Sequence, residues 1–126
     1  DQVRVVGHCD DMPAAYMLCD VAMLPTTKPE SFGRTAVEPQ VMGRPVLASD
    51  HGGTVETVLH GETGWLVKAG DPEAWAAAVA RAIDLGQTKL RAMGQTAANR
   101  ASRLYSVDAM CEATLAAYAR VLEARR

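Results

Sequence analysis

The fold of this chain is decided by residues 21–48, which read VAMLPTTKPESFGRTAVEPQVMGRPVLA. Residues 21–24 and 45–48 are short apolar runs bounded by turn formers, a pattern typical of buried strands. Between them lies a loop rich in proline and threonine, then a stretch at helical spacing over about residues 34–42 that Gly43 ends. A strand, a helix and a second strand in this order predict a parallel pair within an α/β fold.

Pro39 lies inside the predicted helix and complicates its boundaries. Proline has no backbone N–H and costs about 3 kcal/mol in a helix interior, but little in the first turn. Two alternatives follow: the regular helix starts late, near Ala36, or it bends at Pro39.

The same alternation extends outward in both directions. Upstream, residues 3–6 form a β-branched run that predicts another buried strand, followed by a helix that Asp10 or Asp11 caps. Downstream we expect a short helix over residues 55–59 and a strand over residues 65–67. The remaining chain predicts three helices, over residues 72–86, over residues 88–104 and after a Ser106 cap.

Composition narrows the class of protein. The 126 residues carry 13 basic and 15 acidic side chains, so the net charge of -2 argues against nucleic-acid binding. No apolar run is long enough to span a membrane, and the first residues do not resemble a signal peptide, which favours a soluble intracellular protein. The cysteines and histidines show no metal-ligand spacing, so we expect no metal and three buried free thiols, Cys9, Cys19 and Cys111.

Glu30 and Glu38 mark the candidate site. They lie eight residues apart, around a glycine, Gly33, that opens the predicted helix. The free N–H groups of a helix N-terminus suit a phosphate, whereas carboxylates accept hydrogen bonds from sugar hydroxyls, so a ligand with both groups would use both features. The structural alternatives are that Glu30 caps the helix, Glu38 lies on a solvated helix face and Phe32 belongs to the core.

A chain of motifs over roughly residues 3–85 resembles the retaining glycosyltransferases of family four. The matching positions keep the order and spacing of that family, and they are Gly7, Cys19-Asp20-Val21-Ala22, Leu24-Pro25, Glu30-Ser31-Phe32-Gly33, Glu38, Gly43-Arg44-Pro45-Val46, Gly52-Gly53, Glu56 and Gly61-Glu62-Thr63-Gly64. Tyr105-Ser106 echoes a further motif before the last helix. The resemblance covers only the C-terminal, donor-binding domain of the two-domain GT-B architecture.

The resemblance implies a fold and a set of site residues. The fold is a partial Rossmann-like parallel sheet of about four strands, with helices on both faces over residues 1–86 and a helical extension over residues 87–126. Glu30 is expected to act at the reaction centre and Glu38 to bind the ribose of a nucleotide-sugar donor. The remaining donor-binding positions are Ser31, Phe32, Gly33, Arg34 and Thr35, and the nucleobase loop contains Gly7, His8, Cys9 and Asp11.

Two features of the family have no counterpart in this sequence. They are the N-terminal acceptor domain and the first two β-α units of the donor domain, which carry an arginine and a lysine that neutralise the diphosphate. We therefore expect a glycosyltransferase only in a longer parent protein, with this chain alone inactive or nearly so. The alternative is a non-catalytic nucleotide-sugar-binding or scaffold module. The donor base, the sugar and the acceptor cannot be identified from these residues.

The resemblance also predicts the surroundings of the chain. We expect retention of configuration without a metal or other cofactor, and a cytoplasmic location, with peripheral attachment to the inner face of the membrane as the alternative. In the doubly wound strand order 3-2-1-4-5-6, the strands at residues 3–6 and 21–24 lose neighbours, and an open strand edge recruits another strand. We expect residues 3–6 to pair with a second copy in a strand-exchanged homodimer, or to add beside residues 21–24 within one chain.

Overall fold

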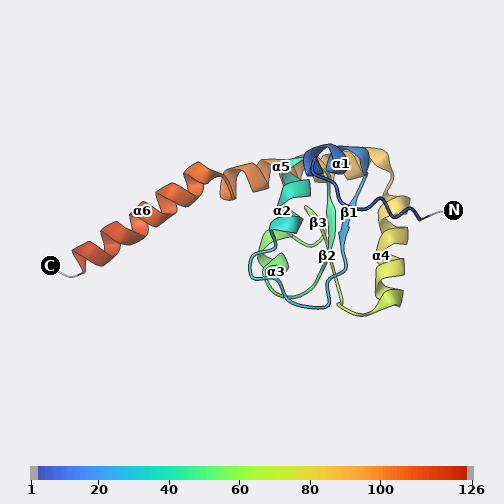
Figure 1. Cartoon of the computed structure of the whole chain (residues 1–126), viewed down its shortest axis with the longest axis horizontal. Coiled ribbons are helices and arrows are strands. Elements are labelled where there is room, and N and C mark those ends of the chain that lie inside the picture. The colour runs from blue at the N-terminus through green and yellow to red at the C-terminus, as the bar shows by residue number, and fades with distance from the viewer. Residues whose placement is uncertain (1–2, 125–126) are drawn as a thin grey trace.

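The computed structural model describes residues 3–124 and contains a parallel three-stranded sheet of order β1-β2-β3 with helices on both faces (Figure 1). In chain order the elements are α1 (Met12–Leu18), β1 (Ala22–Leu24), α2 (Arg34–Val41), β2 (Val46–Ser49), α3 (Thr54–Thr57), β3 (Gly64–Val67), α4 (Pro72–Leu85), α5 (Gln87–Leu104) and α6 (Val107–Glu123). The α/β class and the order of these elements are as predicted.

The three strands run in the same direction, so their carboxyl ends meet at one edge of the sheet. Ala22 of β1 lies opposite Val46 of β2, and Val46 lies opposite Gly64 of β3. Gly64 is required at this position, because a Cβ there would lie 2.1 Å from the Val46 carbonyl oxygen. The loops that follow β1 and β2 therefore leave the sheet side by side.

Alternating side chains of the central strand divide the core into two halves. Leu47 points to one face, where it packs with Trp65 and with Trp75 of α4. Val46 and Ala48 point to the other face, where they pack with Ala36 of α2 and Val58. Figure 1 shows α4 on one side of the sheet and α2 and α3 on the other. The prediction of helices on both faces is confirmed.

The predicted strand over residues 3–6 is wrong. These residues form no strand, and the side chains of Val3, Val5 and Val6 are exposed, Val5 to 95%. The described sheet consequently has three strands rather than about four. A strand needs a neighbour for its backbone N–H and C=O groups, and nothing in residues 3–124 supplies one to this segment. The in-chain pairing with residues 21–24 is also wrong, since β1 pairs only with β2 there.

The start of α2 overturns one of the two alternatives for Pro39. The helix begins at Arg34, directly after Gly33, and the N–H groups of Ala36 and Val37 already donate to the Gly33 carbonyl. The later start near Ala36 is therefore wrong. Pro39 lies inside the helix, where its ring nitrogen leaves the Thr35 carbonyl without its usual helical partner.

The prediction that the three free thiols are buried is wrong. Cys9, Cys19 and Cys111 are free, but none is buried: the first two are half-buried and Cys111 is exposed.

None of the helices within residues 3–124 combines the length and hydropathy of a membrane span.

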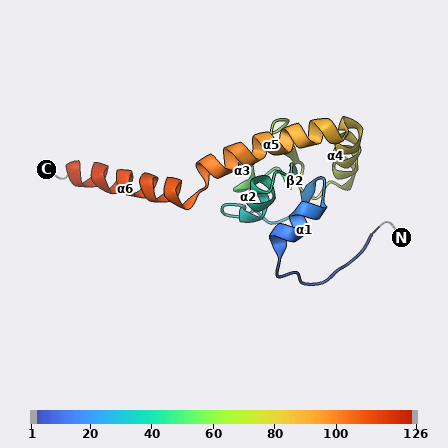
Figure 2. The same cartoon turned by 90° about the horizontal axis from the view of Figure 1, so that it is seen from above.

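The last helix stands apart from the rest of the described chain. Figures 1 and 2 both show α6 extending away from the sheet and the other helices. No residue of α6 is buried, and its exposed apolar side chains include Met110, Leu115 and Tyr118. Its first turn nevertheless lies beside the candidate site, because Val107 and Met110 line the same cavity as Glu38.

Candidate functional site

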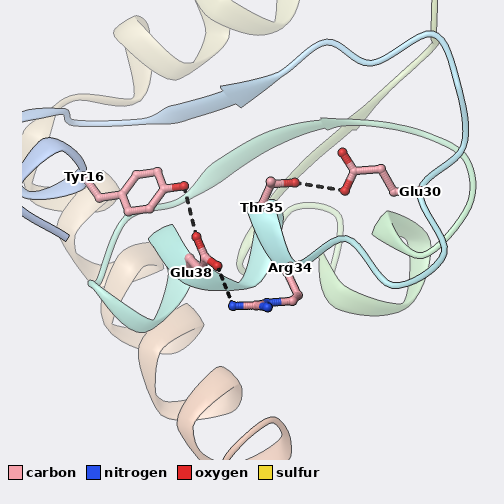
Figure 3. Close-up of polar contacts among 5 residues, drawn as sticks. All are labelled: Tyr16, Glu30, Arg34, Thr35 and Glu38. Atoms are coloured by element: carbon pink, nitrogen blue, oxygen red, sulfur yellow. Dashed lines mark hydrogen bonds and ion pairs between the residues drawn. The ribbon is translucent and has the colours of Figure 1, made fainter. Parts of the chain in front are cut away.

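The loop that joins β1 to α2 carries the first carboxylate of the site. Gly33 caps α2 in the left-handed conformation, at φ +78°, and the first N–H groups of the helix have no partner within the helix itself. The Thr35 hydroxyl donates to Glu30 Oε2 at 3.0 Å. This bond holds the Glu30 carboxylate beside the first turn of α2 (Figure 3).

Glu38 lies one turn further along α2 and is held at both carboxylate oxygens. Arg34 Nη2 lies 3.4 Å from Glu38 Oε1, and the Tyr16 hydroxyl of α1 donates to Oε2 at 3.4 Å. The Glu38 side chain is 42% exposed, so its remaining lone pairs are accessible to a ligand. Burial raises the pKa of Tyr16, and the negative charge of Glu38 raises it further, so the phenol remains a hydrogen-bond donor at neutral pH.

The loop after β2 packs against the backbone of the Glu30 loop. The Gly53 N–H donates to the Glu30 carbonyl at 2.7 Å. A Cβ on Gly53 would lie 2.4 Å from the Phe32 carbonyl carbon, and one on Gly52 would lie 2.6 Å from the Glu30 carbonyl oxygen. The two glycines thus allow a backbone-to-backbone approach that no other residue permits.

Two polar side chains near the carboxyl end of β2 hold the start of the same loop. The Ser49 hydroxyl donates to the Thr26 carbonyl at 2.7 Å, and His51 Nε2 lies 3.1 Å from the same oxygen. The Glu30 loop is therefore held at two places. Ser49 and His51 hold its start at Thr26, and the glycine pair contacts its backbone at Glu30 and Phe32.

Phe32 connects the loop to the junction of α5 and α6. It is 46% exposed, so the alternative in which Phe32 belongs to the core is wrong. Its ring contacts Tyr105, whose hydroxyl donates to the Glu56 carbonyl at 3.1 Å and accepts from Arg100 at 3.3 Å. Arg100 also donates to the Glu56 carbonyl at 2.9 Å, so Tyr105 is fixed to the end of α3.

A cavity of about 900 Å³ opens between α1, α2 and the α5–α6 junction. Three of the predicted donor-binding residues line it, Phe32, Arg34 and Glu38. The rest of its wall is mainly apolar, formed by Met12, Pro13, Tyr16, Val37, Val41, Met42, Tyr105, Val107 and Met110. Glu30 and Thr35 do not line it, and Ser31 is exposed beside them. The structure therefore brings Glu38 together with an apolar cavity and Glu30 with the helix start.

The predicted nucleobase loop is not brought into this cavity. Gly7, His8, Cys9 and Asp11 are absent from its lining, and their side-chain contacts are local. His8 pairs with Asp10 at 3.0 Å, and the Cys9 thiol donates to the Asp11 carbonyl. Asp11 Oδ1 accepts from the Ala14 N–H at 3.0 Å, so this carboxylate caps α1, as one of the two predicted caps.

Four residues that hold the site have no site role in the sequence analysis, although Tyr105 is named there as part of a motif. Ser49 and His51 support the loop, Tyr105 holds Phe32, and Tyr16 contacts Glu38. The glycine pair Gly52-Gly53 is one of the family motifs, and its close packing against the Glu30 loop explains why the chain needs it. The contact between Tyr16 and Glu38 joins residues 22 positions apart, and no local pattern indicates it.

The fold and the site together define a class. A parallel sheet covered by helices on both faces, with a glycine-capped helix after one strand, one carboxylate in the loop before that helix and a second on its second turn, is a Rossmann-like domain of the GT-B type.

Comparison with known proteins then gives the family. Residues 1–100 match the family described as "Glycosyl transferases group 1", and the chain belongs to it. It is 41% identical over 91 residues to D-inositol 3-phosphate glycosyltransferase of Corynebacterium glutamicum, a match covering 72% of this chain and 21% of that protein. A second enzyme of that name, from Catenulispora acidiphila, is 37% identical over 125 residues, covering 98% of this chain and 29% of that protein.

Solved structures have the same architecture. A glycosyltransferase from Rickettsia africae superposes with a TM-score of 0.88 at 27% identity, covering 97% of this chain and 32% of that one. The Anabaena protein Alr3699/HepE, crystallised with UDP and glucose, superposes with a TM-score of 0.86 at 28% identity, covering 95% of this chain and 32% of that one. The chain thus spans between a fifth and a third of the length of these relatives.

Proposed function

We propose that this chain is the donor-binding part of a glycosyltransferase that acts on a nucleoside diphosphate sugar. In the reaction, the bond from the anomeric carbon to the diphosphate breaks and a bond from that carbon to an acceptor hydroxyl forms. The hydroxyl proton ends on the diphosphate. We propose that the new bond forms with retention of configuration and without a metal or another cofactor.

The observation that carries this proposal is the arrangement of polar groups on α2. The Glu30 carboxylate lies beside the helix start and the Glu38 carboxylate one turn later, and between them the N–H groups of Arg34 and Thr35 have no partner within residues 3–124. Helix N–H groups suit a phosphate oxygen, and the carboxylates suit hydroxyls of sugars. We therefore place the ribose at Glu38, the diphosphate at the backbone from Phe32 to Thr35, and the transferred sugar near Glu30.

The cavity beside Glu38 supports an orientation in which the nucleoside end of the donor lies at Glu38 and the sugar end at Glu30. Its apolar wall, including Met12, Pro13 and Val41, offers a surface for the flat faces of a nucleobase, and Glu38 lies at its polar part. The base contacts then come from α1 and α2, and we propose that the loop over residues 7–11, which does not line this cavity, contacts the base from outside it.

The negative charge of the leaving nucleoside diphosphate requires nearby cations, and the described site contains few of them. Arg34 is the cation at the start of α2, but its side chain is 82% exposed and already pairs with Glu38. A diphosphate leaves with its negative charge uncompensated unless further cations face it. We propose that those cations, and the acceptor site, belong to a longer protein of which this chain forms the donor-binding domain, as in the relatives it partly spans.

Location and assembly are part of the same proposal. We place the longer protein in the cytoplasm, where nucleotide-sugar donors are dissolved, with peripheral membrane attachment as the alternative. For the isolated chain we propose a strand-exchanged homodimer, because β1 has a single neighbour and residues 3–6 are exposed within the described chain.

Titration of the isolated chain with UDP, GDP and ADP tests the proposed donor site. We expect weak binding, with NMR shifts at the amides of Gly33, Arg34 and Thr35 and no sugar transfer from the corresponding nucleotide sugars. Submicromolar affinity would show that the phosphate site is already complete. Shifts confined to surfaces away from α2 would refute the placement of the donor.

A further inference from the structure

Tyr16 contacts the carboxylate that we assign to the ribose, although it lies in a different helix. Its hydroxyl donates to Glu38 Oε2, while Arg34 faces the other oxygen, Oε1 (Figure 3). Within the described part of the chain, each oxygen of the carboxylate thus has one side-chain partner. Because a carboxylate offers about four lone-pair sites, room remains for both hydroxyls of a ribose.

The backbone around Tyr16 is anchored by Arg44, which lies in the turn between α2 and β2. Arg44 Nε donates to the Tyr16 carbonyl at 3.2 Å, and Arg44 Nη2 donates to the Met17 carbonyl at 2.8 Å. The Arg44 N–H itself donates to the carbonyl of Pro39, the residue next to Glu38, at 2.9 Å. Hydrogen bonds therefore link the backbone next to Glu38 to Arg44, Arg44 to the Tyr16 backbone, and the Tyr16 hydroxyl to the Glu38 carboxylate.

The two partners of Glu38 differ in how firmly they are held. Arg34 reaches Glu38 as an exposed i,i+4 ion pair, a type of contact that contributes little and weakens with salt. Tyr16 is half-buried in the cavity wall, and its backbone is fixed by Arg44. A neutral phenol also leaves the full negative charge on the carboxylate, which strengthens hydrogen bonds from ribose hydroxyls.

We propose that Tyr16 is a positioning residue that holds the Glu38 carboxylate in the orientation in which it accepts the ribose hydroxyls. The proposal rests on the proposed function, which places the ribose at Glu38. It gives α1 a role in donor affinity, through the Tyr16 side chain, that is independent of the proposed base contacts of the loop over residues 7–11.

The test is steady-state kinetics of the complete glycosyltransferase, with Tyr16→Phe compared with Tyr118→Phe. Tyr118 is an exposed tyrosine on α6 that does not line the cavity beside Glu38, so the control removes the same hydroxyl away from that cavity. We expect Tyr16→Phe to raise the donor KM about three- to tenfold with kcat nearly unchanged, because the Glu38 carboxylate loses one of the two contacts that orient it while its own bonds to the ribose remain possible. Tyr118→Phe should leave both constants as they are.

A double-variant cycle separates positioning from a general structural role. In a Glu38→Gln background, Tyr16→Phe should have little further effect on the donor KM, because the charged acceptor that it orients is gone. An equal effect in both backgrounds would overturn the positioning role, as would a Tyr16→Phe variant with an unchanged donor KM. Thermal melts of each variant show that any change in KM occurs in a folded protein.

The same series distinguishes the two proposals. If Glu38→Gln weakens the donor and Tyr16→Phe does not, Tyr16 has no positioning role and the donor site at Glu38 stands. If Glu38→Gln itself leaves the donor KM unchanged, the ribose is not bound at Glu38, and both proposals are overturned.

Discussion

The rings of Phe32 and Tyr105 pack edge to face, with centroids 5.4 Å apart and an angle of 83° between their planes. Phe32 lies in the loop before α2, whereas Tyr105 ends α5 directly before α6. The hydroxyl of Tyr105 is in turn bonded to the Glu56 carbonyl at the end of α3. The position of the donor loop is thereby linked to the junction from which α6 leaves the domain.

Substitution at Tyr105 should separate the ring contact from the hydroxyl contact. Tyr105→Ala removes both and should raise the donor KM of the complete enzyme about threefold or more, since an aromatic pair contributes about 0.5–1.5 kcal/mol beyond its buried area. Tyr105→Phe keeps the ring and should change the KM less. Tyr118→Ala, on the exposed surface of α6, is the matched control. Equal donor KM values for Tyr105→Ala and the control would show that the ring contact does not hold the loop.

Gly53→Ala should disturb the same loop from the opposite side. The new methyl group would overlap the Phe32 backbone, which lies 2.4 to 2.5 Å from the Cβ position. We expect a loss of stability of about 1–3 kcal/mol, the range for overpacked positions, together with weaker donor binding. Gly70→Ala is the control, because Gly70 has a positive φ of +70° but open space around it, so only backbone strain acts there. Chemical denaturation compares the stabilities, and donor binding that is equally strong in both variants would argue against support by Gly53.

Glu30→Ala should affect turnover more than affinity in the complete enzyme. Its carboxylate lies beside the first turn of α2, held by Thr35, where we place the transferred sugar. A group near the reacting sugar contributes most where charge develops in the transition state. We therefore expect kcat to fall with little change in the donor KM, as measured by initial rates at saturating acceptor. An unchanged kcat would refute the role of Glu30 at the reaction centre.

Light scattering on the isolated chain should detect a homodimer. Residues 3–6 are exposed and β-branched, and in the described chain β1 pairs on one side only. Exchange of residues 3–6 between two copies would supply the missing strand, and hydrogen exchange should then protect the amides of Val5 and Val6. A monomer at high micromolar concentration with unprotected amides in that segment would eliminate the exchanged dimer.

Local patterns predicted most of the elements because their signals lie within a few residues. Asp11, Asp71 and Ser106 each cap a helix with the side-chain bond that their position indicates. The apolar runs around Val46 and Trp65 became strands because neighbouring strands were available to pair with them. Residues 3–6 have an equally strong strand pattern but no neighbour within the described chain, and a strand forms only with one.

The site shows the same division between local and distant information. The bond between Thr35 and Glu30 spans five residues, within one loop and the helix it opens. The contacts of Glu38 with Tyr16 and of Phe32 with Tyr105 depend on how α1 and α5 pack around α2, which periodicity does not encode. In the proposed nucleobase loop, over residues 7–11, the side chains make only local contacts in the described chain, so the structure adds no distant partner for it.

The central claim is that Glu38 binds the ribose of the donor, and calorimetry on the complete enzyme tests it most directly. Glu38→Ala is compared with Glu62→Ala, which removes the same charge from an exposed turn. Loss of a charge-assisted hydrogen bond to a ribose hydroxyl should weaken the donor by about 1.5–3 kcal/mol, roughly a 10- to 150-fold rise in Kd, whereas Glu62→Ala should leave Kd unchanged. Equal Kd values for the two variants would contradict the claim and make Glu38 a structural residue of α2.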